Sequence, residues 1–166
     1  MWVPSLNYDA RPEGARVELV VIHNISLPPG EFGGPWIDAL FQNRLDADAH
    51  PYFKDVAAME VSAHFLIRRD GEVRQYVSTN DRAWHAGVSN WNGRERCNDY
   101  SIGIELEGAD DVPFAEPQYE ELEKLIRALF KRYGVLAIAG HSDIAPGRKT
   151  DPGPWFEWAR IRAWVT

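Results

Sequence analysis

The sequence predicts an α/β or α+β fold in which a β-sheet is covered by helices. Two kinds of segment indicate it: short apolar runs that are typical of strands, and longer segments in which apolar residues recur every three or four positions. The two kinds alternate along the chain. The 166 residues are enough for one ordinary hydrophobic core, and no repeat, low-complexity tract or linker divides them. We therefore expect residues 1–166 to form a single domain.

The N-terminal half is expected to contain a buried strand, a short helix and a hairpin. Residues 17–22 are mostly apolar and β-branched, which is typical of a strand buried on both faces. A loop rich in glycine and proline follows, and Pro35 is placed to begin a helix. Within residues 61–77, two extended runs flank Asp70-Gly71, which is a strong signal for a β-hairpin.

The C-terminal half is expected to contain two strands and two helices. Residues 101–106 alternate, so that three apolar side chains point to one side of the strand while two small residues and a glutamate point to the other. A helix that packs on the sheet is predicted from Pro117 to Gly134, where the apolar spacing is helical. A strand over residues 135–139 and an amphipathic helix over residues 154–165 complete the prediction.

Composition and charge exclude several classes of function. The net charge is −7 and no block of lysines and arginines occurs, so nucleic acid is a poor partner. No apolar run is long enough to span a membrane. The first residues do not resemble a secretory signal, so we expect a cytoplasmic protein. A lone Cys97 allows neither an internal disulfide nor a cysteine-rich zinc site. Nucleotide-binding glycine loops and the common hydrolase motifs are also absent.

Three residues form a candidate metal site. His23 and His141 each follow an apolar run, and Asp151 lies in a loop after the second histidine. Three nitrogen and oxygen ligands with an open position suit a catalytic zinc, whereas structural zinc sites usually have four ligands and are rich in sulfur. Alternatively, the histidines are ordinary strand-end residues and the aspartate caps the last helix. The prolines and glycines around Asp151 favour the metal site, because they can hold a ligand-bearing loop rigid.

Glu105 is the candidate general base. It lies within an otherwise apolar strand, where a carboxylate is unfavourable unless a water on a metal or a cation meets it. A structural ion pair with an arginine is the alternative, and Glu107, which points to the same side of the strand, is the rival for the catalytic role. Lys149 is a candidate for stabilising negative charge on a carbonyl oxygen under attack, unless it is only a solvated loop lysine.

The remaining histidines and one arginine permit more than one interpretation. His64 alternates within a predicted strand and is interpreted as a core histidine, or as one that supports a ligand through a hydrogen bond. His85 follows Trp84 in a loop of small and aromatic residues, which either forms a wall of a groove or simply packs. Arg96 either binds a ligand carboxylate or forms a surface pair with Asp99.

Five segments of the chain carry a resemblance to a known family. They are VIHNISLPPG at 21–30, RAWHAG at 82–87, RERCND at 94–99, GIELEG at 103–108 and GHSDIAP at 140–146. Together they resemble the AmpD-type anhydro-N-acetylmuramyl-L-alanine amidases, within the wider family of zinc amidases that includes phage lysozyme-type amidases and peptidoglycan recognition proteins. The resemblance covers nearly the whole chain. It implies a single catalytic domain over residues 1–166, with a central mixed β-sheet flanked by helices.

The resemblance also implies roles for individual residues. The implied zinc ligands are His23, His141 and Asp151, and the implied catalytic residues are Glu105 and Lys149. The residues that it places on the substrate are Asn24, Trp84, Ala86 and Arg96, the last of them on a carboxylate of the stem peptide. Ser142 departs from the pattern, since similar proteins often have cysteine there. The position lies beside a ligand, so we expect the change to be tolerated.

The implied reaction is hydrolysis of the amide that joins the lactyl group of anhydro-N-acetylmuramic acid to L-alanine. The implied enzyme is a cytoplasmic monomer with one catalytic Zn²⁺ that acts on small anhydromuropeptides during peptidoglycan recycling, without nucleic acid or membrane as partner. Two other interpretations remain: an amidase that degrades intact cell wall with the same chemistry, and a peptidoglycan-binding receptor of the same fold without catalysis. A structural zinc protein is a third. The acidic charge disfavours binding to an anionic wall polymer.

Overall fold

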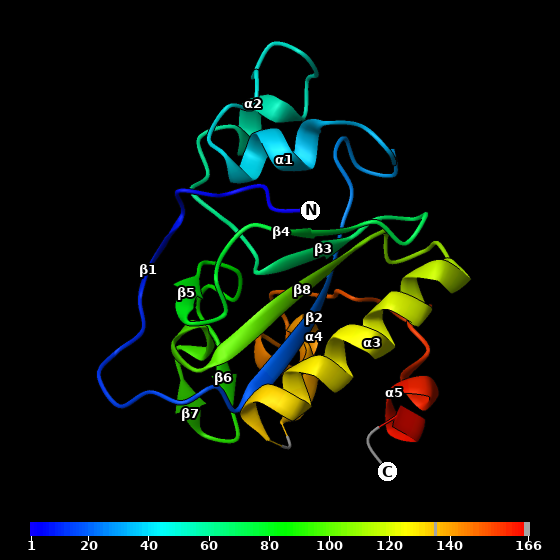
Figure 1. Cartoon of the computed structure of the whole chain (residues 1–166). Helices are drawn as coiled ribbons and strands as arrows, with labels where there is room; N and C mark the ends of the chain where they lie inside the picture. The colour runs from blue at the N-terminus through cyan, green and yellow to red at the C-terminus, as the bar shows by residue number, and fades with distance from the viewer. Residues whose placement is uncertain (135, 165–166) are drawn as a thin grey trace.

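A five-stranded sheet forms the centre of the structure, a computed structural model that describes residues 1–134 and 136–164 (Figure 1). The strand order is β4-β3-β8-β2-β9. The pairings among β3, β8, β2 and β9 are parallel, whereas β4 is antiparallel to β3. The strands are β2 (Leu19–Ile25), β3 (Phe65–Ile67), β4 (Val73–Gln75), β8 (Ser101–Glu107) and β9 (Ala137–Gly140). This mixed sheet and the helices that flank it confirm the predicted fold class.

The first buried strand differs from its predicted range at both ends. β2 begins at Leu19 and continues to Ile25, so His23 lies inside the strand and not beyond its end. The strand continues because β8 supplies backbone partners along its whole length, as far as the pair of Ile25 with Glu107. Apolar residues alone mark the buried part of a strand, and they stop before the polar His23-Asn24 pair.

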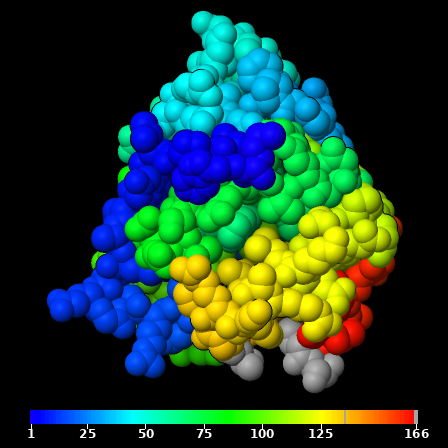
Figure 2. Space-filling view, in the orientation of Figure 1, coloured from blue at the N-terminus to red at the C-terminus, as the bar shows by residue number. Residues whose placement is uncertain are grey.

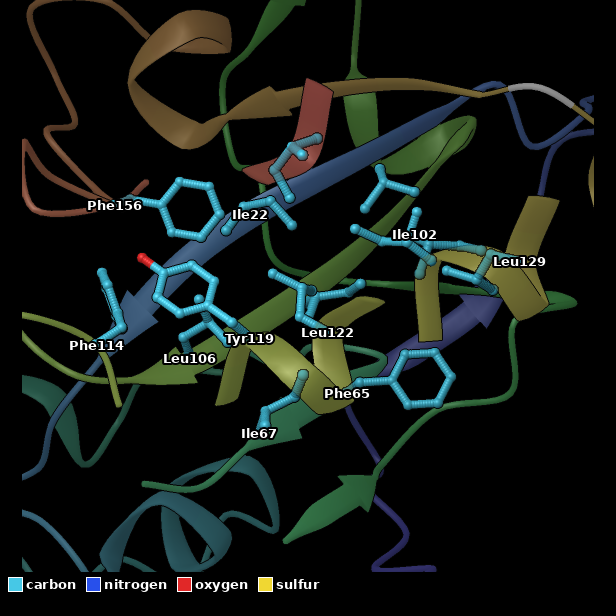
Figure 3. Close-up of a cluster of buried hydrophobic side chains, with 14 of the residues drawn as sticks. Ile22, Phe65, Ile67, Ile102, Leu106, Phe114, Tyr119, Leu122, Leu129 and Phe156 are labelled. Carbon is cyan, nitrogen blue, oxygen red and sulfur yellow. The ribbon is translucent and has the colours of Figure 1, made fainter. Parts of the chain in front are cut away.

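The helix α3 (Glu116–Tyr133) covers one face of the sheet, as predicted, and ends at Gly134, where φ is 88°. Its buried side chains pack on those from β2 and β8 that point to the same side (Figure 3). This cluster includes Tyr119, Leu122, Ile126 and Leu129 from the helix, with Ile22, Ile102, Ile104 and Leu106 from the sheet. Full burial of each aliphatic side chain contributes about 1.5–3 kcal/mol, so this face stabilises the strands that carry the polar residues on their other side.

Two smaller apolar clusters lie away from α3. The first contains buried residues of α1 (Trp36–Phe41) and α2 (Phe53–Val56), and this segment forms one end of the molecule, coloured cyan in Figure 2. Pro35 directly precedes α1, close to the predicted start. The second cluster joins β2 and β9 to the short helices η1 (Cys97–Asp99) and α4 (His141–Ile144). Cys97 lies in this second cluster, where its Sγ contacts the Tyr100 hydroxyl at 3.3 Å.

The predicted hairpin is present but shorter than its predicted range. β3 and β4 are antiparallel, and Gly71 between them has φ of 89°, a conformation that glycine adopts without strain. Residues 61–64 and 76–77 lie outside the two strands. The turn nevertheless occurs where Asp70-Gly71 predicts it.

The predicted closing helix is wrong at its start. α5 spans Trp158–Trp164, whereas residues 154–157 form a turn; residue 165 lies outside the described residues. The physical reason is packing, because Phe156 is buried with its ring centroid 5.8 Å from that of Phe114 and 5.7 Å from that of Tyr119. The turn delivers this side chain to the α3 cluster before the helix begins.

Four short strands were not predicted. β1 (Tyr8–Ala10) pairs with β5 (Asp81–Ala83), and β6 (Asn90–Trp91) pairs with β7 (Arg94–Glu95). They are too short and too polar to give an apolar alternation. Among the described residues, no helix combines the length and the apolar character needed to cross a membrane.

Candidate active site

The face of the sheet opposite α3 carries the candidate catalytic residues. His23 on β2 and Glu105 on β8 are direct partners in the parallel register, so the sheet itself places their side chains next to each other. His141 is the first residue of α4, immediately after β9, which pairs with the other edge of β2. Asp151 lies in the following loop, and its carbonyl accepts a hydrogen bond from the backbone N–H of Ser142. Three neighbouring elements and one loop therefore meet at this point.

The three predicted metal ligands converge on one position. His23 Nδ1 lies 3.0 Å from His141 Nδ1, and each of these nitrogens lies 3.1 Å from Asp151 Oδ2. Ligands bound to zinc at about 2.0–2.1 Å in tetrahedral geometry are about 3.3 Å apart, so the triangle is close to the required size. The two histidines are buried and the aspartate is partly buried. The donor set, two imidazole nitrogens and a carboxylate oxygen, fits a zinc ion with one position left open.

The electrostatics of His23 and Asp151 favour a bound cation. Burial lowers the pKa of His23 to about 4, so its ring is neutral and able to act as a ligand at neutral pH. Burial would raise the pKa of Asp151, but hydrogen bonds with His141 and His23 outweigh it and hold the pKa below its usual range. The aspartate is therefore ionised, and its charge faces the neutral ring of His23.

Glu105 lies beside this triangle with an unsatisfied oxygen. Its side chain is 8% exposed, and its Oε2 has no hydrogen-bond partner among the described residues. Burial raises its pKa well above the ordinary value, the charge of Asp151 adds to the increase, and Lys149 opposes it. A buried carboxylate oxygen without a partner is unfavourable unless a ligand or water meets it. Glu105 also lines a cavity, where such a ligand or water could meet it.

A cavity of about 400 Å³ opens onto these groups. Lys149 is exposed at this cavity, close enough for its charge to act on both Glu105 and His23. Apolar side chains from the loop after β2 and from α1 and α2 also line it, namely Leu27, Leu40, Phe41 and Val56. The cavity thus combines polar and apolar lining residues, as expected of a site for an organic substrate.

The four predicted substrate contacts do not all lie in this cavity. Asn24 and Trp84 line it. Ala86 is fully buried, and its carbonyl oxygen lies 3.1 Å from His141 Nε2. Arg96 has a 71% exposed side chain, pairs with Asp99 at 3.1 Å and lines a neighbouring cavity instead. The roles of all four in substrate binding remain predictions.

Comparison with known proteins identifies the family. The model of the N-acetylmuramoyl-L-alanine amidase family matches residues 13–154. The chain belongs to this family. It is 61% identical over 166 residues to the 1,6-anhydro-N-acetylmuramyl-L-alanine amidase AmpD of Citrobacter freundii, a match that covers 99% of this chain and 89% of that protein. As a member of the family, the protein is a hydrolase that acts on an amide bond.

Solved structures of amidases agree with the assignment of this chain to the N-acetylmuramoyl-L-alanine amidase family. The crystal structure of a selenomethionine derivative of AmpD superposes with a TM-score of 0.97 at 60% identity, covering 99% of this chain and 93% of that one. The Escherichia coli amidase AmiD, solved in complex with the substrate anhydro-N-acetylmuramic acid-L-Ala-D-γ-Glu-L-Lys, superposes with a TM-score of 0.66 at 30% identity. That match covers 93% of this chain and 60% of AmiD. The protein therefore shares its fold, a mixed sheet flanked by helices, with the amidases AmpD and AmiD.

Glu107, the rival of Glu105, has a structural partner in the amidase. Arg68 Nη1 donates a hydrogen bond of 2.8 Å to Glu107 Oε1, and both side chains are almost fully buried. The same oxygen accepts a hydrogen bond of 2.7 Å from Gly33 N in the loop before α1. The ion pair proposed as an alternative for Glu105 is thus formed by its neighbour two residues later.

Glu107→Gln is expected to lower the free energy of unfolding by about 3 kcal/mol, because it leaves the Arg68 charge buried and uncompensated. Unfolding in urea measures the loss. Glu123→Gln, which removes an exposed pair with Arg127, is the control and is expected to change stability by less than about 1 kcal/mol. Equal losses in the two variants would contradict this role of Glu107.

His85 is a site residue whose role the sequence left open. Its Nδ1 lies 2.9 Å from His23 Nε2, and its Nε2 lies 3.1 Å from Ser101 Oγ. Its ring packs over Gly103, where an added Cβ would lie 2.5 Å from His85 Cγ. The two small residues that share a face with Glu105 in the sequence therefore mark the space that this ring occupies. His64, as interpreted, is a buried histidine outside the metal set.

Gly103→Ala is expected to destabilise the amidase by about 1–3 kcal/mol, because the new methyl group overlaps the buried His85 ring. Thermal unfolding in the presence of a chelator measures the loss. Gly34→Ala is the control, since the atoms nearest to its Cβ belong to the side chain of Trp36, the first of them at 3.1 Å. A Gly103→Ala variant as stable as the control would show that the ring has room to move.

Proposed function

We propose that the amidase is zinc-dependent and cleaves the bond between the lactyl group of 1,6-anhydro-N-acetylmuramic acid and L-alanine. The observation that carries the proposal is the convergence of two histidine nitrogens and an aspartate oxygen within 3.1 Å of one another, beside a buried carboxylate, in an open cavity. The 61% identical relative is named for this bond, and the substrate solved with AmiD contains it. Both support the same substrate class for this chain.

The residues around the cavity have complementary tasks in this reaction. Zinc, when bound by His23, His141 and Asp151, supplies a Lewis acid that lowers the pKa of water towards about 7. Glu105 takes a proton from the attacking water on its free Oε2 and later donates it to the leaving amine of L-alanine. Burial raises the pKa of Glu105 above its ordinary value, which favours holding the proton between the two steps. Lys149 stabilises the negative charge that develops on the carbonyl oxygen.

We further propose that the substrate is a soluble fragment met in the cytoplasm during peptidoglycan recycling, and that the enzyme acts as a monomer. The net charge of −7 supports a small fragment over the anionic wall polymer, which it would repel. We propose that Asn24, Trp84 and Ala86 contact the substrate near the metal position, which the lining of the cavity by Asn24 and Trp84 supports. Arg96, which lines a neighbouring cavity, is proposed to bind a carboxylate of the stem peptide.

Parallel digestion of two substrates tests the proposed function. The zinc-loaded protein is incubated with purified anhydromuropeptide and, separately, with intact sacculi, and the products are identified by mass. We expect free stem peptide from the soluble fragment and little from sacculi. Release from sacculi alone would instead indicate a wall-degrading amidase, and release from neither would indicate a receptor. The same assay with Asp151→Ala controls for a contaminating amidase.

A further inference from the structure

His23 and His141 both use Nε2, the ring nitrogen that does not face the metal position, to contact the dipeptide His85-Ala86. His141 Nε2 lies 3.1 Å from the carbonyl oxygen of Ala86. A carbonyl oxygen only accepts hydrogen bonds, so His141 Nε2 carries the hydrogen and its Nδ1 keeps a free lone pair. That Nδ1 is the atom that faces His23 and Asp151. The backbone of residue 86 therefore selects the ring form in which His141 can bind a metal.

The side chain of His85 does the same for His23. If His23 Nδ1 is a metal ligand, its Nε2 carries the hydrogen and must donate it, and His85 Nδ1 lies 2.9 Å away as acceptor. His85 can accept on Nδ1 when its own hydrogen is on Nε2, which lies 3.1 Å from Ser101 Oγ. Because Gly103 leaves room for the ring, the strand that carries Glu105 also fixes the orientation of His85.

Hydrogen bonds to the side chain of Asn98 fix the backbone of the His85-Ala86 dipeptide. The Oδ1 of this residue accepts hydrogen bonds from the backbone N–H of His85, at 3.1 Å, and of Ala86, at 2.8 Å. Arg148 Nη2 also donates to the Ala86 carbonyl, at 2.7 Å, which a carbonyl oxygen with two lone pairs can accept together with His141. His85 and Ala86 are both buried. Burial and these hydrogen bonds therefore hold both acceptors, His85 Nδ1 and the Ala86 carbonyl oxygen, in place beside His23 and His141.

We propose that His85 and the Ala86 carbonyl, anchored by Asn98, are positioning residues of the metal site that hold both ligand rings in the form with Nδ1 free. This inference rests on the proposed zinc dependence and adds the groups that prepare the site for the ion. This positioning role is separate from the substrate contact proposed for Ala86, because it uses the Ala86 carbonyl oxygen that faces His141. Loss of such supporting hydrogen bonds typically weakens metal binding 10–100-fold, so we expect the effect chiefly in zinc affinity.

Zinc affinity of paired variants tests this proposal. His85→Ala removes the acceptor for His23 Nε2, whereas His85→Asn keeps a polar atom near the position of Nδ1. His64→Asn is the matched control, because His64 is a fully buried histidine whose ring centroid lies 5.8 Å from that of His85. Its hydrogen-bond partners are backbone atoms of Asp81 and Gly103 and the side chain of Arg11, and none of them is a predicted metal ligand. The zinc dissociation constant is measured by competition with a chromophoric chelator, and folding is checked by circular dichroism without metal.

We expect His85→Ala to weaken zinc binding about 10–100-fold, His85→Asn to recover most of the loss, and His64→Asn to change it less than about threefold. Folded His85→Ala that binds zinc as tightly as the wild type would overturn the inference. Equal weakening by His85→Ala and His64→Asn would also overturn it, since general loosening would then explain both. Failure of the wild type to bind zinc would instead refute the proposed function, so the two failures are distinguishable.

A measurement on the wild type keeps the proposal testable if His85→Ala does not fold. In protein with ¹⁵N-labelled histidines and one equivalent of zinc, NMR reports which ring nitrogen carries each hydrogen. We expect hydrogen on Nε2 of His23, His85 and His141, and a nitrogen–nitrogen coupling through the hydrogen bond between His23 Nε2 and His85 Nδ1. Hydrogen on Nδ1 of His85 would contradict the proposed acceptor role.

Discussion

Glu105→Gln is expected to lower kcat by about 10²–10⁴-fold while leaving zinc binding unchanged. The substitution keeps the size of the side chain but removes the group that accepts and returns a proton, a contribution of this magnitude in general acid–base catalysis. Glu105 is not one of the three atoms that converge on the metal position, so the ion should still bind. Release of stem peptide from anhydromuropeptide, followed by chromatography, measures kcat, and elemental analysis measures bound zinc.

Two controls separate catalysis from folding in this experiment. Glu120→Gln, an exposed position on α3, should keep full activity. Glu107→Gln should lose stability through its Arg68 partner and yet keep kcat close to that of the wild type at a temperature where it is folded. A Glu105→Gln enzyme with wild-type kcat, or a loss of kcat confined to Glu107→Gln, would show that the catalytic role is assigned to the wrong carboxylate.

Asp151→Ala is expected to abolish the stabilisation of the protein by zinc. A ligand present at about 1,000 times its dissociation constant stabilises the native state by about 4 kcal/mol, which corresponds to roughly 10 °C in Tm for a chain of this size. Asp151 supplies one of three ligand atoms and the only negative charge among them, so its loss should remove most of this shift. Thermal unfolding with zinc and with chelator gives the difference for each variant.

The control for this prediction is Asp55→Ala, an exposed carboxylate on α2 that should keep the full zinc-dependent shift in Tm. If Asp151→Ala showed the same shift as the wild type, zinc would bind elsewhere on the chain. A shift absent from the wild type as well would mean that the converging side chains do not form a zinc site under these conditions.

The sheet and the main residues of the site were accessible from the sequence for physical reasons. Glu105 stands out as a carboxylate inside an otherwise apolar strand, where it is unfavourable without a partner. His23 and His141 stand out because each directly follows an apolar run. Strict alternation in residues 101–106 separates the core face from the face that carries Glu105, and the structure confirms it. His23 is placed differently from the prediction, which put it at the end of a strand. It lies inside β2, where its register with β8 pairs it with Glu105.

The supporting residues were not accessible in the same way. His85 lies in a loop, and its approach to His23 depends on how residues 85–98 fold back over β8, which local pattern does not encode. The small residues Ser101 and Gly103 indicated that another side chain packs over this part of the strand, but they did not identify it as His85. Ala86 contributes a backbone carbonyl, for which its side chain gives no indication. The turn at residues 154–157 likewise follows from the packing of Phe156.

Zinc titration of hydrolysis tests the central claim most directly. Metal-free protein is mixed with anhydromuropeptide, zinc is added in steps, and the initial rate of stem-peptide release is plotted against equivalents of zinc. With a single site formed by His23, His141 and Asp151, the rate should rise linearly from near zero and reach a plateau at one equivalent. A full rate in metal-free protein, or a plateau only at two equivalents, would contradict a mechanism that depends on one zinc ion.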